Sequence, residues 1–345
     1  MTLYATIDCG TTNSRVYIVD DQGIIYGKAT KTVGVKDTAI TGSRTTLQNG
    51  IHDLILEALK QAGKSSRDLT AILSSGMITS EIGLVELPHL VAPCSVDDLA
   101  NNIVKVDDIN IVDENIPIYF VRGIKNKIAS EIKSATELVG EADFMRGEET
   151  QIAGMLSRPA FSLPAVIVIL SSHTKFIPID KGGLVLGSLT TMSGQLYEAI
   201  INNTFVGKSV NKGNNTEEEP KDYFDQMIVD HAINWIRKVG LVRTLMFPRF
   251  LDVLFHTTWY ERHLFFEALI AAEDMLAIGQ LDLFGNNLPS TFILVGTDER
   301  CRLYRHMLRK QFSQSNLLAI TKIDEIDDLS IQGILTIARK AGIVK

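Results

Sequence analysis

The chain has 345 residues, 45% of them hydrophobic and 22% charged, which is the composition of a folded globular protein with enough length for two domains. Its formal net charge of -7 excludes a protein that attracts nucleic acid or an anionic membrane over its whole surface. Its three cysteines are too few and too widely spaced for a disulfide framework or a zinc ribbon, and they favour a reducing compartment.

The sequence also argues against a membrane protein. Its longest purely apolar run, Ala165–Leu170, is far shorter than the roughly 18 to 20 residues that cross a bilayer. The N-terminus enters a strand pattern at Tyr4 without the basic, apolar and small-residue segments of a secretion signal. We therefore expect a cytoplasmic protein that enters no membrane. Its oligomeric state is left open, with a homodimer as one alternative.

Two consecutive hairpins open the chain. Alternating apolar residues predict three strands, at Tyr4–Asp8, Ser14–Val19 and Ile24–Lys28. The turns between them fall at Gly10–Asn13 and at Asp20–Gly23, where glycine and polar residues favour tight reversals.

A helix and a further strand follow these hairpins. Apolar residues at the spacing of one helical face predict a helix over Leu47–Gln61, and Gly63 follows it as a C-cap. Thr70–Ser74 is then predicted to be a strand. This succession indicates an α/β protein.

The chain contains an internal repeat. When it is shifted by 160 residues, the segment from Thr11 aligns without a gap on the segment from Ser171, with five identities in 24 positions. The identities alone are few, but hydroxyl residues also face hydroxyl residues, and Arg15 faces Lys175. A period of this length predicts a duplicated domain, because the repeats of solenoid proteins are only about 20 to 50 residues long.

The second copy repeats the predicted elements of the first. Its strands are expected at Val166–Leu170, Phe176–Ile179 and Leu184–Leu189, and Ser193 is expected to cap the next helix. The proline-containing segment Arg158–Pro164 precedes it. We therefore expect two similar lobes, 1–160 and 161–345, with a cleft between them.

The rest of the second lobe is predicted to alternate between helices and a strand. Asn211–Lys221 is expected to be a solvated loop. The later elements are helices at Tyr223–Val239 and Arg262–Ile278, a strand at Thr291–Val295, a turn at Gly296–Asp298 and a helix from Glu299.

The two hairpin turns are candidate phosphate-binding sites. Backbone N–H groups and hydroxyls that converge in a tight turn suit a phosphate group. The first turn offers Gly10, Thr11, Thr12 and Asn13, and the second offers Ser171, Ser172 and His173. Asp8, just before the first turn, is a candidate ligand for Mg²⁺, which takes one or two carboxylates together with phosphate oxygens.

Each of these features has an ordinary alternative. The pattern Asp-x-Gly-Thr is a common turn, and Arg15 and Lys175 are as compatible with pointing outward as with contacting phosphate. The charged segment Asp143–Gln151 is equally typical of a solvated helix start, where acidic residues favour the helix dipole. Ser75–Met77 is compatible with a simple turn at the end of a strand.

Taken together, these segments resemble the 2-dehydro-3-deoxygalactonokinase family, within the sugar kinases and actin-like ATPases, over nearly the whole chain. The segments that carry the resemblance are Ile7–Arg15, Ser75–Ser80, Val91–Pro93, Met145–Gln151 and His173–Phe176. The stretch Met-Arg-Gly-Glu-Glu-Thr-Gln is the most specific of them.

The resemblance implies a duplicated RNase H-like fold that binds ATP and Mg²⁺. It implies transfer of the γ-phosphate to the terminal hydroxyl of 2-dehydro-3-deoxy-D-galactonate, a step of galactonate catabolism. Arg146 would pair with the substrate carboxylate or bind phosphate. Glu148, or alternatively Glu149, would accept the proton of the attacking hydroxyl. The remaining implied residues are Ser75, Gly76 and Met77 for the sugar acid and Gly296 and Thr297 for adenosine.

The chain departs from the family pattern at three places. Ser171 stands where the family's second phosphate turn usually has glycine, and Cys9 stands where the family usually has tryptophan after the N-terminal Asp. Near the expected adenosine site, the run of small residues is reduced to Gly296-Thr297. The Cβ of serine limits close backbone approach to a phosphate. Two alternatives to a kinase therefore stay open, namely a sensor that binds nucleotide or sugar acid without turnover, and a phosphohydrolase of the same superfamily.

Overall fold

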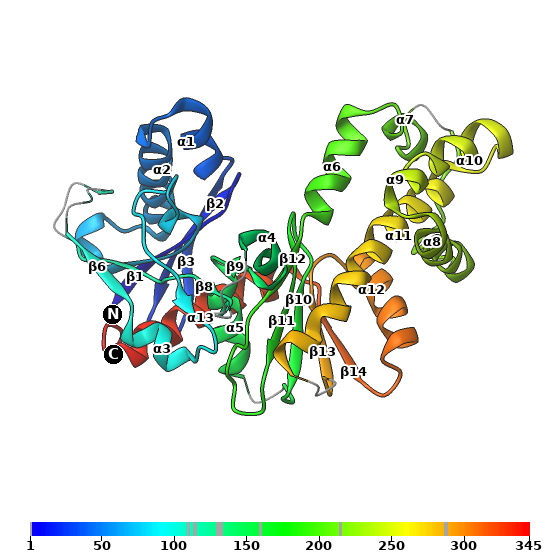
Figure 1. Cartoon of the computed structure of the whole chain (residues 1–345). Coiled ribbons are helices and arrows are strands. Elements are labelled where there is room, and N and C mark those ends of the chain that lie inside the picture. Colours follow the sequence, from blue (N-terminus) through cyan, green and yellow to red (C-terminus); the bar gives the residue numbers. More distant parts are fainter. Residues whose placement is uncertain are drawn as a thin grey trace. The chain divides into compact units, whose positions relative to one another are not determined.

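The computed structural model describes residues 2–107, 109, 111–112, 116–128, 134–158, 161–213, 216–285 and 289–345. These residues form two compact units (Figure 1). The first consists of Met1–Pro164, Ile179–Ser188 and Ile323–Lys345, and the second of Ala165–Pro178 and Leu189–Lys322. Two short parts of the predicted segments lie outside the described residues: 159–160 of the lobe boundary and 214–215 of the polar loop.

The sheet of the first unit has the strand order β3-β2-β1-β4-β7-β6. Strands β1, β2 and β3 are antiparallel neighbours, β4 is parallel to β1, β7 is parallel to β4, and β6 is antiparallel to β7. Their bounds are β1 Leu3–Cys9, β2 Ser14–Asp20, β3 Ile25–Lys31, β4 Leu69–Gly76, β6 Val104–Val106 and β7 Ile118–Phe120. The two predicted opening hairpins and the strand after them are therefore confirmed.

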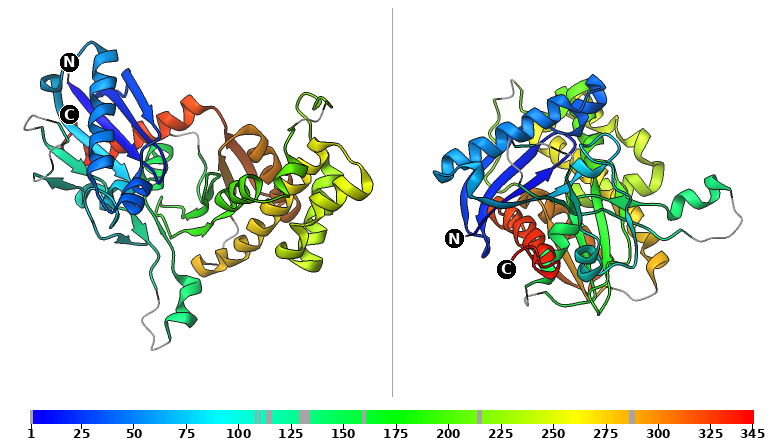
Figure 2. Two further views of the ribbon diagram at one scale, coloured as in Figure 1. Left: turned by 90° about the horizontal axis from the view of Figure 1, so that it is seen from above. Right: turned by 90° about the vertical axis from the view of Figure 1, so that its left-hand side faces the viewer.

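Helices α2 and α13 cover opposite faces of this sheet (Figure 2). Helix α2 (Thr45–Ala62) buries its apolar face so closely that a Cβ on Gly27 of β3 would lie 2.0 Å from the Ala58 carbonyl oxygen. The remaining elements of the unit are α1 Val35–Thr41, α3 Val96–Asn101, α4 Ala135–Leu138, α5 Glu148–Leu156 and α13 Ile323–Lys340, with a small sheet of β5 Leu90–Val91, β8 Ile124–Lys125 and β9 Phe144–Met145.

Helix α13 belongs to the first unit, although it lies at the end of the chain. The division expected from the sequence placed it in the lobe 161–345. The helix packs on α5 at a crossing made of glycines: a Cβ on Gly333 would lie 1.6 Å from the Thr150 carbonyl oxygen, and one on Gly154 would lie 2.0 Å from that of Leu329. Such close contact between two helix backbones requires residues without side chains.

The sheet of the second unit has the order β12-β11-β10-β13-β14, which repeats the order of the first five strands above. Strands β10, β13 and β14 are parallel neighbours, and β12 is antiparallel to β11. Their bounds are β10 Ala165–Ile169, β11 Thr174–Ile179, β12 Leu189–Thr191, β13 Thr291–Val295 and β14 Asn316–Ile320. Its helices are α6 Ser193–Asn203, α7 Gly207–Val210, α8 Gln226–Val239, α9 Leu241–Thr244, α10 Phe247–Phe255, α11 Trp259–Ala277 and α12 Asp298–Gln311.

Several predicted elements differ from the structure. Helix α8 begins at Gln226 rather than Tyr223, and the N-cap of α6 is Met192 rather than Ser193. The strand expected at Leu184–Leu189 is wrong, because the N–H of Ser188 bonds the Asn126 side chain at 2.8 Å and β12 begins only at Leu189. Helix α11 begins at Trp259 rather than Arg262, because Thr258 accepts the Glu261 N–H in a capping box. No helix in the described ranges is both long and apolar enough to cross a membrane.

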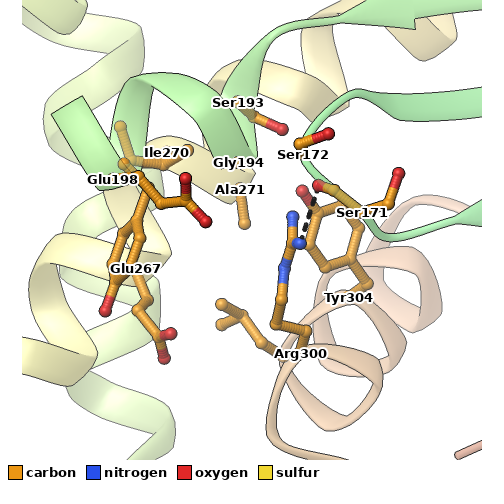
Figure 3. A pocket seen from close by; sticks show the side chains of 12 residues that line it. Ser171, Ser172, Ser193, Gly194, Glu198, Glu267, Ile270, Ala271, Arg300 and Tyr304 are labelled. Carbon is orange, nitrogen blue, oxygen red and sulfur yellow. Dashed lines mark hydrogen bonds between the residues drawn. The ribbon is translucent and has the colours of Figure 1, made fainter. Parts of the chain in front are cut away.

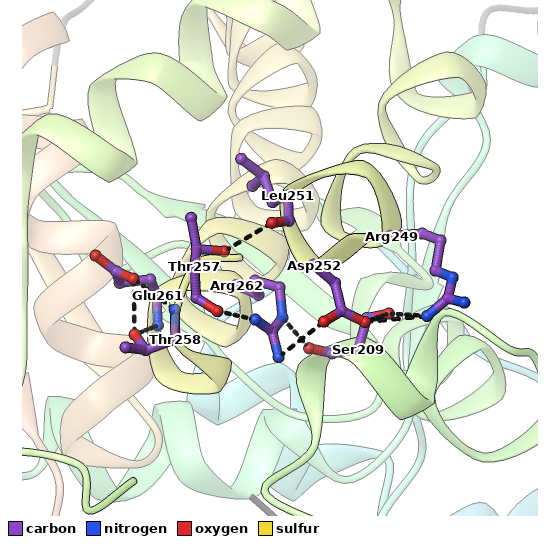
Figure 4. Close-up of polar contacts among 8 residues, drawn as sticks. All are labelled: Ser209, Arg249, Leu251, Asp252, Thr257, Thr258, Glu261 and Arg262. Carbon is purple, nitrogen blue, oxygen red and sulfur yellow. Dashed lines mark hydrogen bonds and ion pairs between the residues drawn. The ribbon is translucent and has the colours of Figure 1, made fainter. Parts of the chain in front are cut away.

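A buried arginine joins the helices of the second unit (Figure 4). Arg262 of α11 is 4% exposed; it donates to the carbonyl oxygens of Ser209 and Thr257 and pairs with Asp252 of α10 at 3.5 Å. Asp252 also accepts the Ser209 hydroxyl at 2.8 Å and pairs with Arg249 at 3.0 Å. Because buried charges require partners, this cluster fixes α7 and α10 on α11.

Matching hydrogen bonds confirm the internal repeat. The Oδ1 atom of Asp20 accepts the backbone N–H groups two and four residues later, both at 2.9 Å, and that of Asp180 accepts the corresponding pair, both at 2.8 Å. The glycine of each turn has a positive φ, +85° at Gly23 and +84° at Gly183. These two turns are separated by the same 160 residues as the aligned sequences.

Candidate active site

The first candidate phosphate turn joins β1 to β2. The N–H of Gly10 donates to the Asn13 carbonyl at 2.9 Å, while the carbonyls of Gly10 and Thr11 accept the first two N–H groups of α1 at 3.3 and 2.9 Å. The side chains of Thr11, Thr12 and Asn13 are exposed. The turn therefore directs carbonyls toward α1 and presents hydroxyl and amide donors to solvent, as an anion site requires.

Asp8 precedes this turn on β1. Its side chain is 31% exposed and pairs with Arg15 of β2, whose Nη1 lies 3.3 Å from Oδ2. Burial raises the pKa of Asp8, and Arg15 opposes that shift. Among the described residues, no three His, Cys, Asp or Glu side chains gather closely enough to hold a metal. A single carboxylate nevertheless suits Mg²⁺ that is held mainly by nucleotide phosphates and water.

The end of β4 lies beside Asp8. In the parallel register, Asp8 faces Ser75 and Cys9 faces Gly76. Gly76 has φ +91°, and a Cβ there would lie 2.4 Å from the Cys9 carbonyl oxygen, so the position requires glycine. Ser75 is buried, whereas Met77, the next residue after Gly76, is half-buried and begins a short 3₁₀ turn.

Arg146 is anchored between β9 and α5. Its Nη1 donates to the Thr79 hydroxyl at 2.6 Å, and its Nη2 donates to the Leu87 carbonyl at 2.7 Å. His89 lies 3.4 Å from the same Nη2, and burial together with Arg146 lowers the pKa of His89 to about 4, so this imidazole is neutral at neutral pH. These contacts hold the half-buried guanidinium in one orientation.

The two glutamates that follow Gly147 have different environments. Glu149 is 0% exposed, and both its carboxylate oxygens accept the Gly147 N–H, at 2.8 and 2.7 Å. Burial and the neighbouring Glu148 raise the pKa of Glu149 to about 8. Glu148 is half-buried at the first position of α5. Gly147 itself lies against Gly76, because a Cβ there would be 3.4 Å from the Gly76 Cα.

The second candidate phosphate turn joins β10 to β11. The Ser171 hydroxyl donates to the His173 carbonyl at 2.9 Å, and the Ser172 carbonyl accepts the Gln195 N–H of α6 at 2.8 Å. Among the described residues other than glycine, positive φ angles occur only at Asp222 and His256, so Ser171 has an ordinary backbone conformation. Its replacement of the family glycine therefore introduces no backbone strain here.

Two cationic side chains, Lys175 and Arg300, lie near this turn, and the turn itself contains the imidazole of His173. Lys175 is 7% exposed, and its Nζ donates to the Thr190 hydroxyl on β12 at 2.8 Å. Arg300 of α12 donates from Nη1 to the Ser171 carbonyl at 3.0 Å. Burial lowers the pKa of His173, and Lys175 lowers it further. Arg300 therefore reaches the turn directly, and it is a residue that the sequence analysis missed.

A cavity of 220 Å³ opens beside the second turn (Figure 3). Helices α6, α11 and α12 each contribute lining residues at positions i, i+3 and i+4, and α6 also contributes Ser193. Its lining consists of Ser171 and Ser172, of Ser193, Gly194, Tyr197 and Glu198 on α6, of Glu267, Ile270 and Ala271 on α11, and of Arg300, Leu303 and Tyr304 on α12. This spacing is the signal that could have located the cavity from the sequence.

The residues expected to bind adenosine lie just before this helix face. A Cβ on Gly296 would lie 2.8 Å from the Leu170 Cβ, and the Thr297 hydroxyl accepts the Arg300 N–H at 3.4 Å as the N-cap of α12. Neither is among the residues that line the cavity. Inside it, burial raises the pKa of Glu267, while His263 at 3.7 Å and Arg300 oppose that shift.

The family and the relative that match this sequence are both named as deoxygalactonokinases. The profile of the 2-keto-3-deoxy-galactonokinase family matches residues 8–337. A protein named "Probable 2-dehydro-3-deoxygalactonokinase" from Rhizobium meliloti (strain 1021) is 24% identical over 207 residues, a match that covers 60% of this chain and 59% of that relative.

Solved structures share the fold. A crystal structure described as a 2-dehydro-3-deoxygalactonokinase protein from Sinorhizobium meliloti superposes with a TM-score of 0.69 at 22% identity, over 97% of this chain and 98% of that one. A reductive activator for a corrinoid, iron-sulfur protein gives a TM-score of 0.50 at 12% identity, over 99% of this chain and 61% of that one. Together with the repeated strand order, these matches confirm the duplicated α/β fold. By the family profile that covers nearly its whole length, the chain belongs to the 2-keto-3-deoxy-galactonokinase family.

Proposed function

We propose that this protein transfers the γ-phosphate of ATP to the terminal hydroxyl of a 2-keto-3-deoxy sugar acid and so forms its 6-phosphate. Within that class we propose 2-dehydro-3-deoxy-D-galactonate, which the names of the family and of its relatives support. One structural observation carries the proposal: Asp8 and the Arg146–Glu148 loop both lie at the end of β4. A phosphoryl transferase requires a phosphate site and an acceptor site this close together.

Glu148 is the residue we propose as the proton acceptor for the attacking hydroxyl. Glu148 is half-buried and follows Gly147, which lies against Gly76 at the end of β4, whereas Glu149 is fully buried and bonded to the Gly147 N–H. A general base must come within hydrogen-bond reach of the proton that it removes. Glu149 therefore supports the loop rather than touching the substrate.

We propose that Arg146 binds the carboxylate of the sugar acid. Gly76 and Met77 would contact the same substrate, and the buried Ser75 would support them. A guanidinium has five N–H donors, so its bonds to Thr79 and Leu87 leave donors for a ligand. Because these bonds already fix its orientation, little conformational entropy is lost when an anion binds.

Each of the two turns is proposed to bind phosphate. Thr11, Thr12 and Asn13 would donate to phosphate in the first unit, and Ser171, Ser172 and His173 in the second. Asp8, with Arg15 beside it, would hold Mg²⁺, which neutralises charge on the phosphate oxygens during transfer. The base and ribose would occupy the cavity lined by Glu198 and Glu267, with Lys175, Gly296 and Thr297 supporting the turn and α12.

An activity screen tests this function. Purified protein is incubated with Mg-ATP and a panel of 2-keto-3-deoxy sugar acids, and phosphorylated product is followed by ³¹P NMR and mass spectrometry. We expect a 6-phosphate product with the C6 acids and none with Asp8→Ala. The kinase proposal is wrong if no acid gives product above that control. Phosphate release without acceptor would select the hydrolase, and calorimetric binding without turnover would select the sensor.

We further propose a cytoplasmic location. The free cysteines Cys9, Cys94 and Cys301 are all buried, and burial raises the thiol pKa of each to about 12. Free thiols are the ordinary state of cysteine in a reducing compartment, and ATP and sugar acids of catabolism occur there as well. Fractionation of the producing cell tests this location, which a periplasmic or secreted pool of the protein would contradict.

A further inference from the structure

We propose that Arg300 is a positioning residue that fixes the second phosphate turn in its binding conformation. Its Nη1 donates to the Ser171 carbonyl at 3.0 Å, and its Nη2 donates to the Thr174 hydroxyl at 3.3 Å (Figure 3 shows the bond to Ser171). These acceptors stand at the beginning and at the end of the turn. One planar guanidinium thus bridges both ends, which a lysine ammonium on its single flexible stem does less well.

The two copies of the repeat show why this turn needs an outside donor. In the first copy, the carbonyl of Thr11 accepts the Lys36 N–H from the start of α1 at 2.9 Å. The equivalent carbonyl in the second copy is that of Ser171, and the equivalent N–H is that of Leu196, which instead bonds the Met192 carbonyl within α6 at 2.8 Å. Arg300 supplies the donor that the helix backbone supplies in the first copy.

The position of Arg300 also connects the turn with the cavity. The side chain lines the cavity together with Ser172, whose exposed hydroxyl lies 3.4 Å from the His173 Nδ1 atom. Glu198 and Glu267 are the carboxylates in the same lining, and Arg300 opposes the rise in the pKa of Glu267. A nucleoside in the cavity would therefore contact the residue that holds the phosphate turn in place. This last step rests on the proposed function.

The first experiment requires no nucleotide. Hydrogen exchange on the millisecond-to-second scale is compared between the wild-type protein and Arg300→Met for the peptide that spans residues 170–176. Loss of two charge-assisted bonds is expected to speed exchange there about tenfold. Arg309→Met, an exposed arginine in the last turn of the same helix, should leave it unchanged. Equal exchange in wild type and Arg300→Met would overturn the proposal.

The second experiment distinguishes an effect of Arg300 on the phosphate turn from an effect on the cavity. Calorimetry measures ADP and adenosine binding to the wild type, Arg300→Met and Arg300→Lys. We expect Arg300→Met to weaken ADP about tenfold and adenosine less than about twofold, with Arg300→Lys intermediate for ADP. An equal loss for both ligands would mean that Arg300 acts by shaping the cavity, and the proposal would be wrong. If wild type binds neither ligand, the proposed function fails, and the exchange experiment still decides the role of Arg300.

Discussion

Asp8 in the first copy of the repeat corresponds to Val168 in the second, and Gly10 corresponds to Leu170. The two hairpins otherwise share strand order, Asp-capped turns and the glycines Gly34 and Gly194, whose Cβ atoms would lie 2.4 and 2.3 Å from the carbonyls of the phosphate turns. The backbone was therefore conserved between copies while the chemistry diverged. The first copy has a carboxylate suited to Mg²⁺, and the second has a cavity and an arginine.

The substitution Asp8→Asn tests this comparison and is expected to have the largest effect. Because the second copy has no carboxylate at the equivalent position, nothing there can replace the charge of Asp8, and kcat should fall by at least about a hundredfold. The measurement is the steady-state rate of sugar-acid phosphorylation over a range of Mg²⁺ concentrations. Asp21→Asn, next to the Asp-capped turn at Asp20, serves as the control and should keep its activity. Activity of Asp8→Asn within tenfold of wild type would contradict the division of roles.

The next test compares the two glutamates of the first unit. Glu148→Gln should lower kcat about a hundredfold with little change in KM, as expected for loss of a general base. Glu149→Gln keeps an acceptor for the Gly147 N–H and should lower kcat less than about tenfold. The rates are measured at saturating ATP across pH. If Glu149→Gln is the more damaging of the two, the buried residue participates in the chemistry and our assignment is reversed.

The pKa of Glu149 predicts a pH dependence of stability. Burial holds this pKa near 8 in the folded protein, above the ordinary value of 4.5, so the folded state retains a proton that the unfolded state has lost. The stability from this proton is complete below about pH 4.5 and is lost as pH rises toward about 8, by up to about 1.4 kcal/mol for each pH unit. Denaturant unfolding of Glu149→Gln should show a shallower decline than the wild type. Glu57→Gln, an exposed residue of α2, should follow the wild type.

The hairpins were predictable because their determinants are local. Alternating apolar residues predict the strands, and Asp20 with Gly23 predicts the turn between them. The internal repeat then predicts the same turn at Asp180 and Gly183. The segment around Arg146, which we propose for catalysis, was found through the family resemblance. The assignment of substrate, metal and base residues remains a prediction that the proposed experiments address.

Other features depend on contacts between segments that are distant in the sequence, so no local sequence pattern predicts them. The packing of α13 on α5 rests on Gly154 and Gly333, two glycines that look like ordinary helix interruptions in the sequence. The sequence places Glu149 in what is typically a solvated helix start, yet its side chain is fully buried. Arg300 lies in a charged helix start, and its role depends on a carbonyl 129 residues earlier.

The smallest effect is expected at Ser171, where the sequence suggested a defect. Its backbone is not in the left-handed region, so restoring the family glycine relieves no strain, and Ser171→Gly removes a hydroxyl that, among the described residues, bonds the His173 carbonyl. We expect the KM for ATP to change less than about threefold, because the carbonyl that Arg300 holds is retained. The matched change in the first copy, Thr11→Gly, removes an exposed donor at the equivalent position and should raise that KM more. If Ser171→Gly instead raised kcat tenfold, the second turn would be an impaired copy rather than a specialised one.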